Sequence, residues 1–109
     1  MSVFDALKKI LTPAPPESIP EDALLIDVRS PEEFSGGSVA QAINIPVNQI
    51  HLIANHQAAK NKSRPIVVFC ASGMRSGLAK RQLISMGYET VMNGGGLSQM
   101  ISRVSQSNK

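Results

Sequence analysis

The chain has 109 residues, of which 42% are hydrophobic and 17% are charged. This length accommodates one domain with a single core, and the ordinary charged fraction excludes wholesale disorder. The single cysteine excludes an internal disulfide and a cysteine-rich metal site, so the thiol is buried filler, a link to a partner or a reactive nucleophile.

Charge is distributed unevenly along the chain. Residues 1–33 carry three basic and seven acidic side chains, whereas residues 34–109 carry eight basic side chains and one acidic side chain. A basic second half favours an anionic partner. The few aromatic residues are scattered and form no stacking platform, so we expect a small anion and no nucleic acid.

The N-terminal region lacks the pattern of an export signal. Asp5 and the pair Lys8–Lys9 lie where a signal peptide needs its hydrophobic stretch. No apolar run approaches the ~20 residues that span a bilayer. We therefore expect a cytoplasmic protein with no firm membrane signal, in a reducing compartment that suits a free thiol.

Three segments can be distinguished by their residue patterns. Near the N-terminus, apolar side chains at helical spacing predict an amphipathic helix that folds back onto the domain: Val3, Phe4, Leu7, Ile10 and Leu11. A stiff proline-rich connector follows this helix. We assign residues 1–16 to the helix and connector, 17–105 to the main domain and 106–109 to a tail.

The main domain alternates strands with helices. Four apolar runs have the length and composition of strands: Leu24–Val28, Ala42–Pro46, Ile66–Phe69 and Thr90–Met92. Between and after them, helices are predicted from Pro31 and over Val47–Asn55, Ser76–Met86 and Leu97–Val104. This alternation predicts an α/β fold with a parallel sheet of about four or five short strands and helices on both faces.

Two short motifs mark where elements of this pattern begin or end. Ser30, Pro31 and Glu33 form a strong helix start, because serine caps the helix, proline suits its first position and glutamate completes a capping box. The run Gly94–Gly96 lacks the further glycine of a dinucleotide fingerprint and is interpreted as a turn.

The cysteine lies where parallel sheets bind ligands. Cys70 directly follows the strand Ile66–Phe69 and precedes a helix, at the carboxyl edge of the sheet. Gly73 can take a positive φ, so the loop can wrap its N–H groups around an anion. Arg75 and the helix N-terminus add positive charge. Together these features predict a reactive thiol whose pKa is lowered.

The loop Cys70-x-x-Gly73-x-Arg75 after a strand resembles the active-site loop of the rhodanese family of sulfurtransferases. Further segments resemble that family in the same order: Leu25–Arg29 with Glu32–Phe34, Ala42–Pro46, Gly87–Tyr88 and Gly94–Gly96. The resemblance covers about residues 17–104. It departs at Gly37–Gln41, where relatives commonly carry Gly-His-Ile-x-Gly and this chain has Ser38 and Gln41.

The resemblance implies a thiosulfate sulfurtransferase with Cys70 and Arg75 as catalytic residues. Cys70 would take a sulfane sulfur from thiosulfate or another persulfide donor and pass it to cyanide or a thiol acceptor, which could be a protein thiol. The intermediate would be a persulfide bound by backbone N–H groups of the loop residues Ala71, Ser72, Gly73, Met74 and Arg75. No metal or organic cofactor is implied.

Two other functions are compatible with the same residues. One is a non-catalytic module that binds a partner or only relays sulfur. Another is a cysteine phosphatase or arsenate reductase, although these have a longer loop than the four residues between Cys70 and Arg75 here. Asp27, Arg29 and Glu33 are expected to support the loop, with Asp27 or Glu33 paired to Arg75 as a helper or as a structural ion pair.

Overall fold

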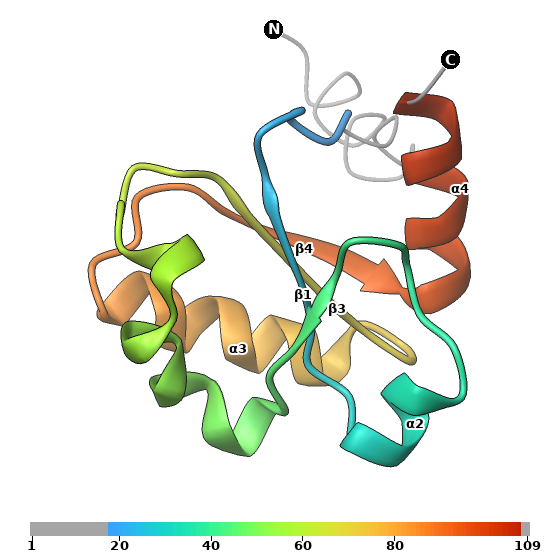
Figure 1. Ribbon diagram of the computed structural model, residues 1–109, viewed down its shortest axis with the longest axis horizontal. Coiled ribbons are helices and arrows are strands. Elements are labelled where there is room, and N and C mark those ends of the chain that lie inside the picture. The colour runs from blue at the N-terminus through green and yellow to red at the C-terminus, as the bar shows by residue number, and fades with distance from the viewer. Residues whose placement is uncertain (1–17, 108–109) are drawn as a thin grey trace, which may run out of the picture.

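The computed structural model describes residues 18–107, and the predicted N-terminal helix lies outside the described residues (Figure 1). Four parallel strands form one sheet in the order β2-β1-β3-β4. Their bounds are Leu24–Asp27 for β1, Ile43–Asn44 for β2, Ile66–Cys70 for β3 and Val91–Gly96 for β4. The predicted α/β fold with a parallel sheet is therefore confirmed.

The helical elements lie close to their predicted positions. The bounds are α2 (Pro31–Ser35), the 3₁₀ segments η1 (Val47–Asn55) and η2 (Gln57–Ala59), α3 (Met74–Ser85) and α4 (Leu97–Ser107). The capping box at Ser30 and Glu33 is formed as predicted. The helix expected over Val47–Asn55 is a 3₁₀ helix, α3 begins at Met74, and α4 continues to Ser107 into the expected tail.

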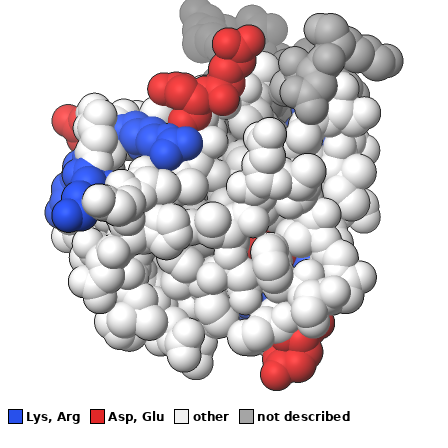
Figure 2. Space-filling model, viewed as in Figure 1, with Lys and Arg blue, Asp and Glu red and all other residues white. Residues whose placement is uncertain are grey.

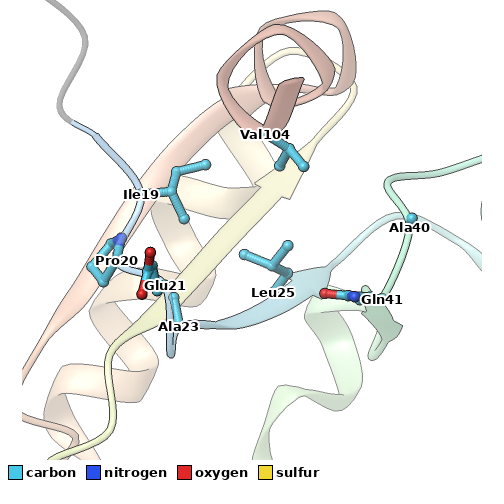
Figure 3. Close-up of a pocket in the computed structure, with 8 residues that line it drawn as sticks. All are labelled: Ile19, Pro20, Glu21, Ala23, Leu25, Ala40, Gln41 and Val104. Atoms are coloured by element: carbon cyan, nitrogen blue, oxygen red, sulfur yellow. The ribbon is translucent and has the colours of Figure 1, made fainter. Parts of the chain in front are cut away.

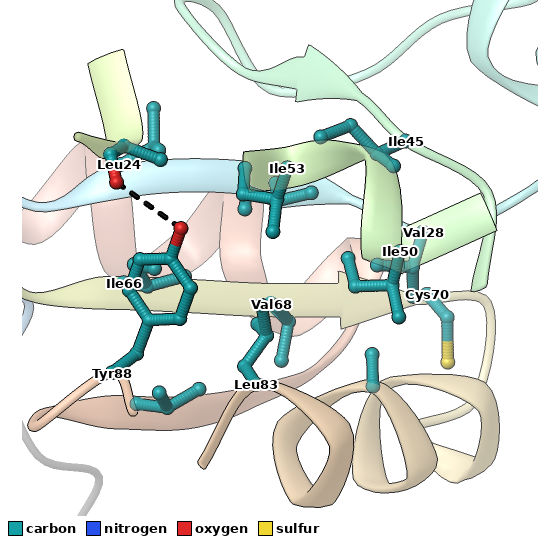
Figure 4. Packing of buried hydrophobic residues seen from close by; sticks show 14 residues of the cluster. Leu24, Val28, Ile45, Ile50, Ile53, Ile66, Val68, Cys70, Leu83 and Tyr88 are labelled. Carbon is teal, nitrogen blue, oxygen red and sulfur yellow. Dashed lines mark hydrogen bonds between the residues drawn. The ribbon is translucent and has the colours of Figure 1, made fainter. Parts of the chain in front are cut away.

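Each face of the sheet has its own core. On one face, Ile26 and Val68 are fully buried beneath η1 and α3, in contact with the cluster that includes Ile53 and Leu83 (Figure 4). On the other face, Val67, Phe69 and α4 residue Met100 form a smaller cluster. Because successive strand residues point to opposite faces, β3 contributes to both cores, and all five of its residues are buried.

The run Gly94–Gly96 is not the turn that its composition suggested. These glycines belong to β4, which pairs with β3 through Cys70 and Gly96 and contains a register shift opposite Val68 and Phe69. A Cβ atom on Gly96 would lie 2.7 Å from the carbonyl oxygen of Ala71. Glycine is needed here because the loop after Cys70 packs directly on the end of the strand.

None of the helices between residues 18 and 107 is long and apolar enough to cross a membrane.

Candidate active site

Cys70 is the last residue of β3, and its side chain is fully buried. Figure 4 shows its sulfur atom at the end of the strand, beside α3. The next two residues, Ala71 and Ser72, are exposed, so the sulfur lies just beneath the protein surface. Gly73 has the positive φ that the sequence predicted, +95°, and lets the chain turn into α3.

Hydrogen bonds surround the sulfur. The backbone N–H of Gly73 donates to Sγ at 2.9 Å, and the hydroxyl of Ser76 lies 3.5 Å from Sγ. Burial of Cys70 by itself raises the pKa of the thiol. For the ionised sulfur, donation by the Ser76 hydroxyl and by the N–H groups of Ser76, Ser72 and Gly73 outweighs burial and lowers the pKa below its ordinary value. This direction agrees with the sequence prediction.

Arg75 is bound to α2 through Glu33. Its Nη1 and Nη2 atoms donate to Oε1 and Oε2 of Glu33 at 2.7 and 3.0 Å. This pairing confirms one of the two partners considered for Arg75. The hydrogen bonds from Arg75, together with a backbone hydrogen bond from Ser30, lower the pKa of Glu33 to about 2. Both paired side chains are more than one-third exposed, so solvent screens the interaction.

Asp27 is the partner of Arg29 and not of Arg75. Its carboxylate is fully buried and accepts from Nε of Arg29 at 3.0 Å and from Nη2 at 2.8 Å. The hydrogen bond to Asp27 raises the pKa of Arg29. A further hydrogen bond, from Nη2 to the carbonyl oxygen of Gly37 at 2.7 Å, connects Arg29 to the turn after α2. The pair therefore joins the end of β1 to the turn after α2.

The turn at Gly37–Gln41 forms although two of its residues depart from the family pattern. Ser38, where relatives commonly have histidine, donates its hydroxyl to Asp27 at 2.7 Å. Gln41, where they have glycine, adopts a φ of +70° and is the one non-glycine residue with positive φ between residues 18 and 107. The turn thus contains a glutamine in a conformation that favours glycine.

Ser76 and Asn93 also belong to the site, and the sequence analysis did not identify them. Ser76 is fully buried, and its hydroxyl donates to Oδ1 of Asn93 at 2.7 Å. Asn93 lies in β4, which neighbours β3. The adjacency of carboxyl ends in a parallel sheet is the signal that could have placed Asn93 near Cys70.

Two surface pockets differ in their relation to this site. A pocket of about 250 Å³ is lined by Arg75 together with residues from the start of α2 and η1, including Ser30 and Val47. A larger pocket of about 340 Å³ lies elsewhere and is lined by Leu25, Gln41 and Val104 among others (Figure 3). No residue of the Cys70 loop lines the larger pocket, so we assign the smaller one to the site.

Some of the basic side chains of the second half lie far from the loop. Lys62 and Arg64 precede β3, whereas Cys70 is its last residue. Because the strand has five residues, its two ends are roughly 13 Å apart. Arg64 donates to the backbone carbonyl of Asp22 at 2.8 Å, a structural contact. Figure 2 shows the larger basic areas of this face at the edge away from α2. The loop's own cation is Arg75.

We also searched residues 18–107 for side chains that could bind a metal ion. Between residues 18 and 107, no group of three or more His, Cys, Asp or Glu side chains lies close enough to hold a metal ion. The functional groups around Cys70 are N–H donors, a hydroxyl and a guanidinium, which suit an anion.

The chain was compared with protein families, with known proteins and with solved structures. The family model for the rhodanese-like domain matches residues 13–101. The chain therefore belongs to the rhodanese-like family.

Several members of the family are similar to the chain over most of its length. The thiosulfate sulfurtransferase PspE of Escherichia coli is 42% identical over 76 residues, which cover 69% of this chain and 71% of that protein. A sulfurtransferase of Allochromatium vinosum is 38% identical over 73 residues, and the match spans 67% of this chain but only 65% of that relative.

Solved structures show the same fold. A rhodanese with anions from E. coli has a TM-score of 0.66 at 41% identity, and the match covers 71% of this chain and 89% of that one. The human single-domain sulfurtransferase TSTD1 also has a TM-score of 0.66, at 28% identity, with 84% of this chain and 98% of that chain covered.

Proposed function

We propose that the protein is a thiosulfate sulfurtransferase that works through a persulfide on Cys70. The observation that carries this proposal is the Gly73 N–H donated to the buried Cys70 sulfur at 2.9 Å, in a loop that leads into α3. This donor favours a sulfur anion over a neutral thiol. The similarity to PspE of E. coli supports thiosulfate as the donor.

The reaction has two stages. The Cys70 thiolate attacks the outer sulfur of thiosulfate, so that a new S–S bond forms at Sγ while the bond to the sulfonate sulfur breaks and sulfite leaves with its electron pair. Cyanide then attacks the terminal sulfur of the persulfide, and thiocyanate leaves as Cys70 returns to the thiolate. A thiol acceptor would receive the sulfur in the same way, as its own persulfide.

The loop would stabilise the Cys70 thiolate and, after the first stage, the negatively charged terminal sulfur of the persulfide. Its backbone N–H groups, from Ala71 to Arg75, would donate to the terminal sulfur of the persulfide, and fixed donors of this kind need no reorganisation during the reaction. Arg75 would add positive charge at the rim of the adjacent pocket and attract the dianionic donor.

The acceptor must come from another molecule. Cys70 is the only cysteine of the sequence, so no thiol within it can take the sulfur from the persulfide. A small thiol, cyanide or a thiol of a partner protein would serve. This supports a role in which the protein delivers sulfur and does not form an internal disulfide.

A steady-state assay with thiosulfate and cyanide tests the proposal. We expect the wild-type protein to form thiocyanate and the Cys70→Ser variant to lose this activity. Ser85→Ala is the matched control, because Ser85 is exposed at the far end of α3 and its removal should leave the rate unchanged. Equal rates for wild type and Cys70→Ser would overturn the proposal.

Phosphate esters provide the contrasting substrate. Only four residues separate Cys70 from Arg75, whereas the loops of cysteine phosphatases have five. This arrangement favours a single sulfur atom over a tetrahedral oxyanion. Hydrolysis of an aryl phosphate that depends on Cys70, without thiocyanate formation, would favour a phosphatase instead.

A further inference from the structure

The side-chain amide of Asn93 joins three groups around Cys70. Its Oδ1 atom accepts from the Ser76 hydroxyl at 2.7 Å and from the Gly95 N–H at 2.9 Å, and its Nδ2 atom donates to the carbonyl oxygen of Gly73 at 3.1 Å. These partners fix the orientation of the amide. If the amide were turned over, its NH₂ would face the Gly95 N–H, and its oxygen would face the Gly73 carbonyl.

This orientation determines where the Ser76 proton lies. A hydroxyl carries one proton, and Oδ1 of Asn93 can only accept, so the proton of Ser76 lies in the 2.7 Å bond. The oxygen of Ser76, 3.5 Å from Sγ, is then left to accept from the Cys70 thiol. The described hydrogen bonds therefore correspond to a protonated Cys70.

Ionisation of Cys70 changes the sulfur from a hydrogen-bond donor to an acceptor. A thiolate has no proton to donate and needs donors, so the Ser76 hydroxyl must turn away from Asn93 to stabilise it. Oδ1 of Asn93 would then keep only the Gly95 N–H, at 2.9 Å. One proton is thus shared between two acceptors, the Asn93 amide oxygen and the Cys70 sulfur.

We propose that Asn93 is a positioning residue that competes with Cys70 for the Ser76 proton and so limits how readily the thiol ionises. The proposal deepens the proposed function, because it rests on Cys70 as the nucleophile. It predicts that the reactivity of the sulfur depends on a residue of β4 whose hydrogen bonds go to Ser76, Gly73 and Gly95 and not to the sulfur.

The charged groups around the sulfur are the same whether the Ser76 hydroxyl points to Asn93 or to Cys70. Arg75 on α3 and Glu33 on α2 form one pair, and Asp27 and Arg29 after β1 form another. Neither pair is bonded to Asn93. Asn93 itself is exposed, so water competes for its amide and the expected effect is modest.

A double-mutant cycle at Ser76 and Asn93 tests the competition. The thiolate absorbance of Cys70 is titrated against pH in wild type, Asn93→Ala, Ser76→Ala and the double variant, with Cys70→Ser as the baseline. The single cysteine makes this signal specific, and burial raises the pKa of the only tyrosine, Tyr88, further from the range of interest. The titration needs no sulfur donor, so its result is independent of whether sulfur transfer occurs.

We expect Asn93→Ala to lower the pKa of Cys70 by about half a unit when Ser76 is present, because the hydroxyl is then free to turn toward the sulfur. In the Ser76→Ala background, the same substitution should not lower the pKa. An equal shift in both backgrounds would mean that Asn93 only anchors Gly73, and that result would overturn the proposal. A rise, or no change, with Ser76 present would also overturn it.

Asn93→Asp provides a second variant with the opposite expectation. A carboxylate accepts the Ser76 proton more strongly than an amide does, so the pKa of Cys70 should rise. The added negative charge acts in both backgrounds, but the extra rise should require the Ser76 hydroxyl. A rise of equal size with and without that hydroxyl would contradict the proposal.

Discussion

Glu33 and Arg75 lie 42 positions apart in the sequence and form a bidentate ion pair, with both carboxylate oxygens bound to the guanidinium at 2.7 and 3.0 Å. Glu33 also accepts from the N–H and the hydroxyl of Ser30, so the start of α2 fixes the orientation of its carboxylate. The pair therefore joins α2 to the first turn of α3, next to the Cys70 loop.

This pair should make stability depend on pH in the acid range. The folded-state pKa of Glu33, about 2, lies below the ordinary value of 4.5, so the ionised carboxylate stabilises the fold above pH 4.5 and this contribution is lost as the pH falls toward 2. We expect Glu33→Gln to lower the Tm by an amount on the order of 2 °C at neutral pH. The difference from wild type should disappear near pH 2.

Thermal melts of both proteins across this pH range provide the measurement. Glu32→Gln is the matched control, because it removes the neighbouring carboxylate of the same helix and leaves the Arg75 pair intact. A Tm difference for Glu33→Gln that persists unchanged at pH 2, or one equal to that of the control, would contradict the role assigned to the pair.

The turn after α2 offers a site for stabilisation. Gln41 has a φ of +70°, and this left-handed conformation is unfavourable by about 1 kcal/mol for residues other than glycine. Gln41→Gly should therefore raise the free energy of unfolding by roughly 0.5–1 kcal/mol, measured by urea denaturation. Ala40→Gly, one residue earlier and without a positive φ, should be neutral or destabilising. If Gln41→Gly were the less stable of the two, the strain at this position would be refuted.

Those parts of the fold that depend on local signals could be predicted from the sequence. Continuous β-forming residues predicted β3, the capping pattern at Ser30 predicted α2, and the spacing from Cys70 to Arg75 predicted the loop and the positive φ of Gly73. Each of these depends on a few consecutive residues, so no tertiary information was needed.

The parts that could not be predicted depend on contacts between distant segments. From the sequence, Glu33 and Asp27 were equally plausible ion-pair partners for Arg75. In the structure, Asp27 is paired with Arg29 instead. The glycines of β4 suggested a turn because glycine is depleted in strands, but the close approach of the Cys70 loop accounts for Gly96. Asn93 follows the predicted strand Thr90–Met92, but its contact with Ser76 depends on the adjacency of β3 and β4, which local patterns do not determine.

Gly96 should be required for activity more than for folding. A Cβ atom at this position would lie 2.7 Å from the carbonyl oxygen of Ala71, so Gly96→Ala must displace the loop that surrounds the sulfur. We expect thiocyanate formation to fall by at least about tenfold, since a displacement on the order of 1 Å can reduce a rate by 10²-fold. Far-UV circular dichroism should show the fold retained.

A matched glycine substitution controls for this effect. Gly36 has an ordinary φ of −75°, and a Cβ atom there would lie no closer than 3.4 Å to its neighbours, so Gly36→Ala should keep both activity and fold. Full activity of Gly96→Ala would show that the close approach at Ala71 does not constrain the loop.

The proposed mechanism requires Cys70 to carry the sulfur during transfer. Intact mass spectrometry of the protein after incubation with thiosulfate tests it most directly. We predict a mass increase of one sulfur atom, located on Cys70, absent from Cys70→Ser and removed by cyanide. An unmodified wild-type protein, or the same addition on the Cys70→Ser variant, would contradict the account.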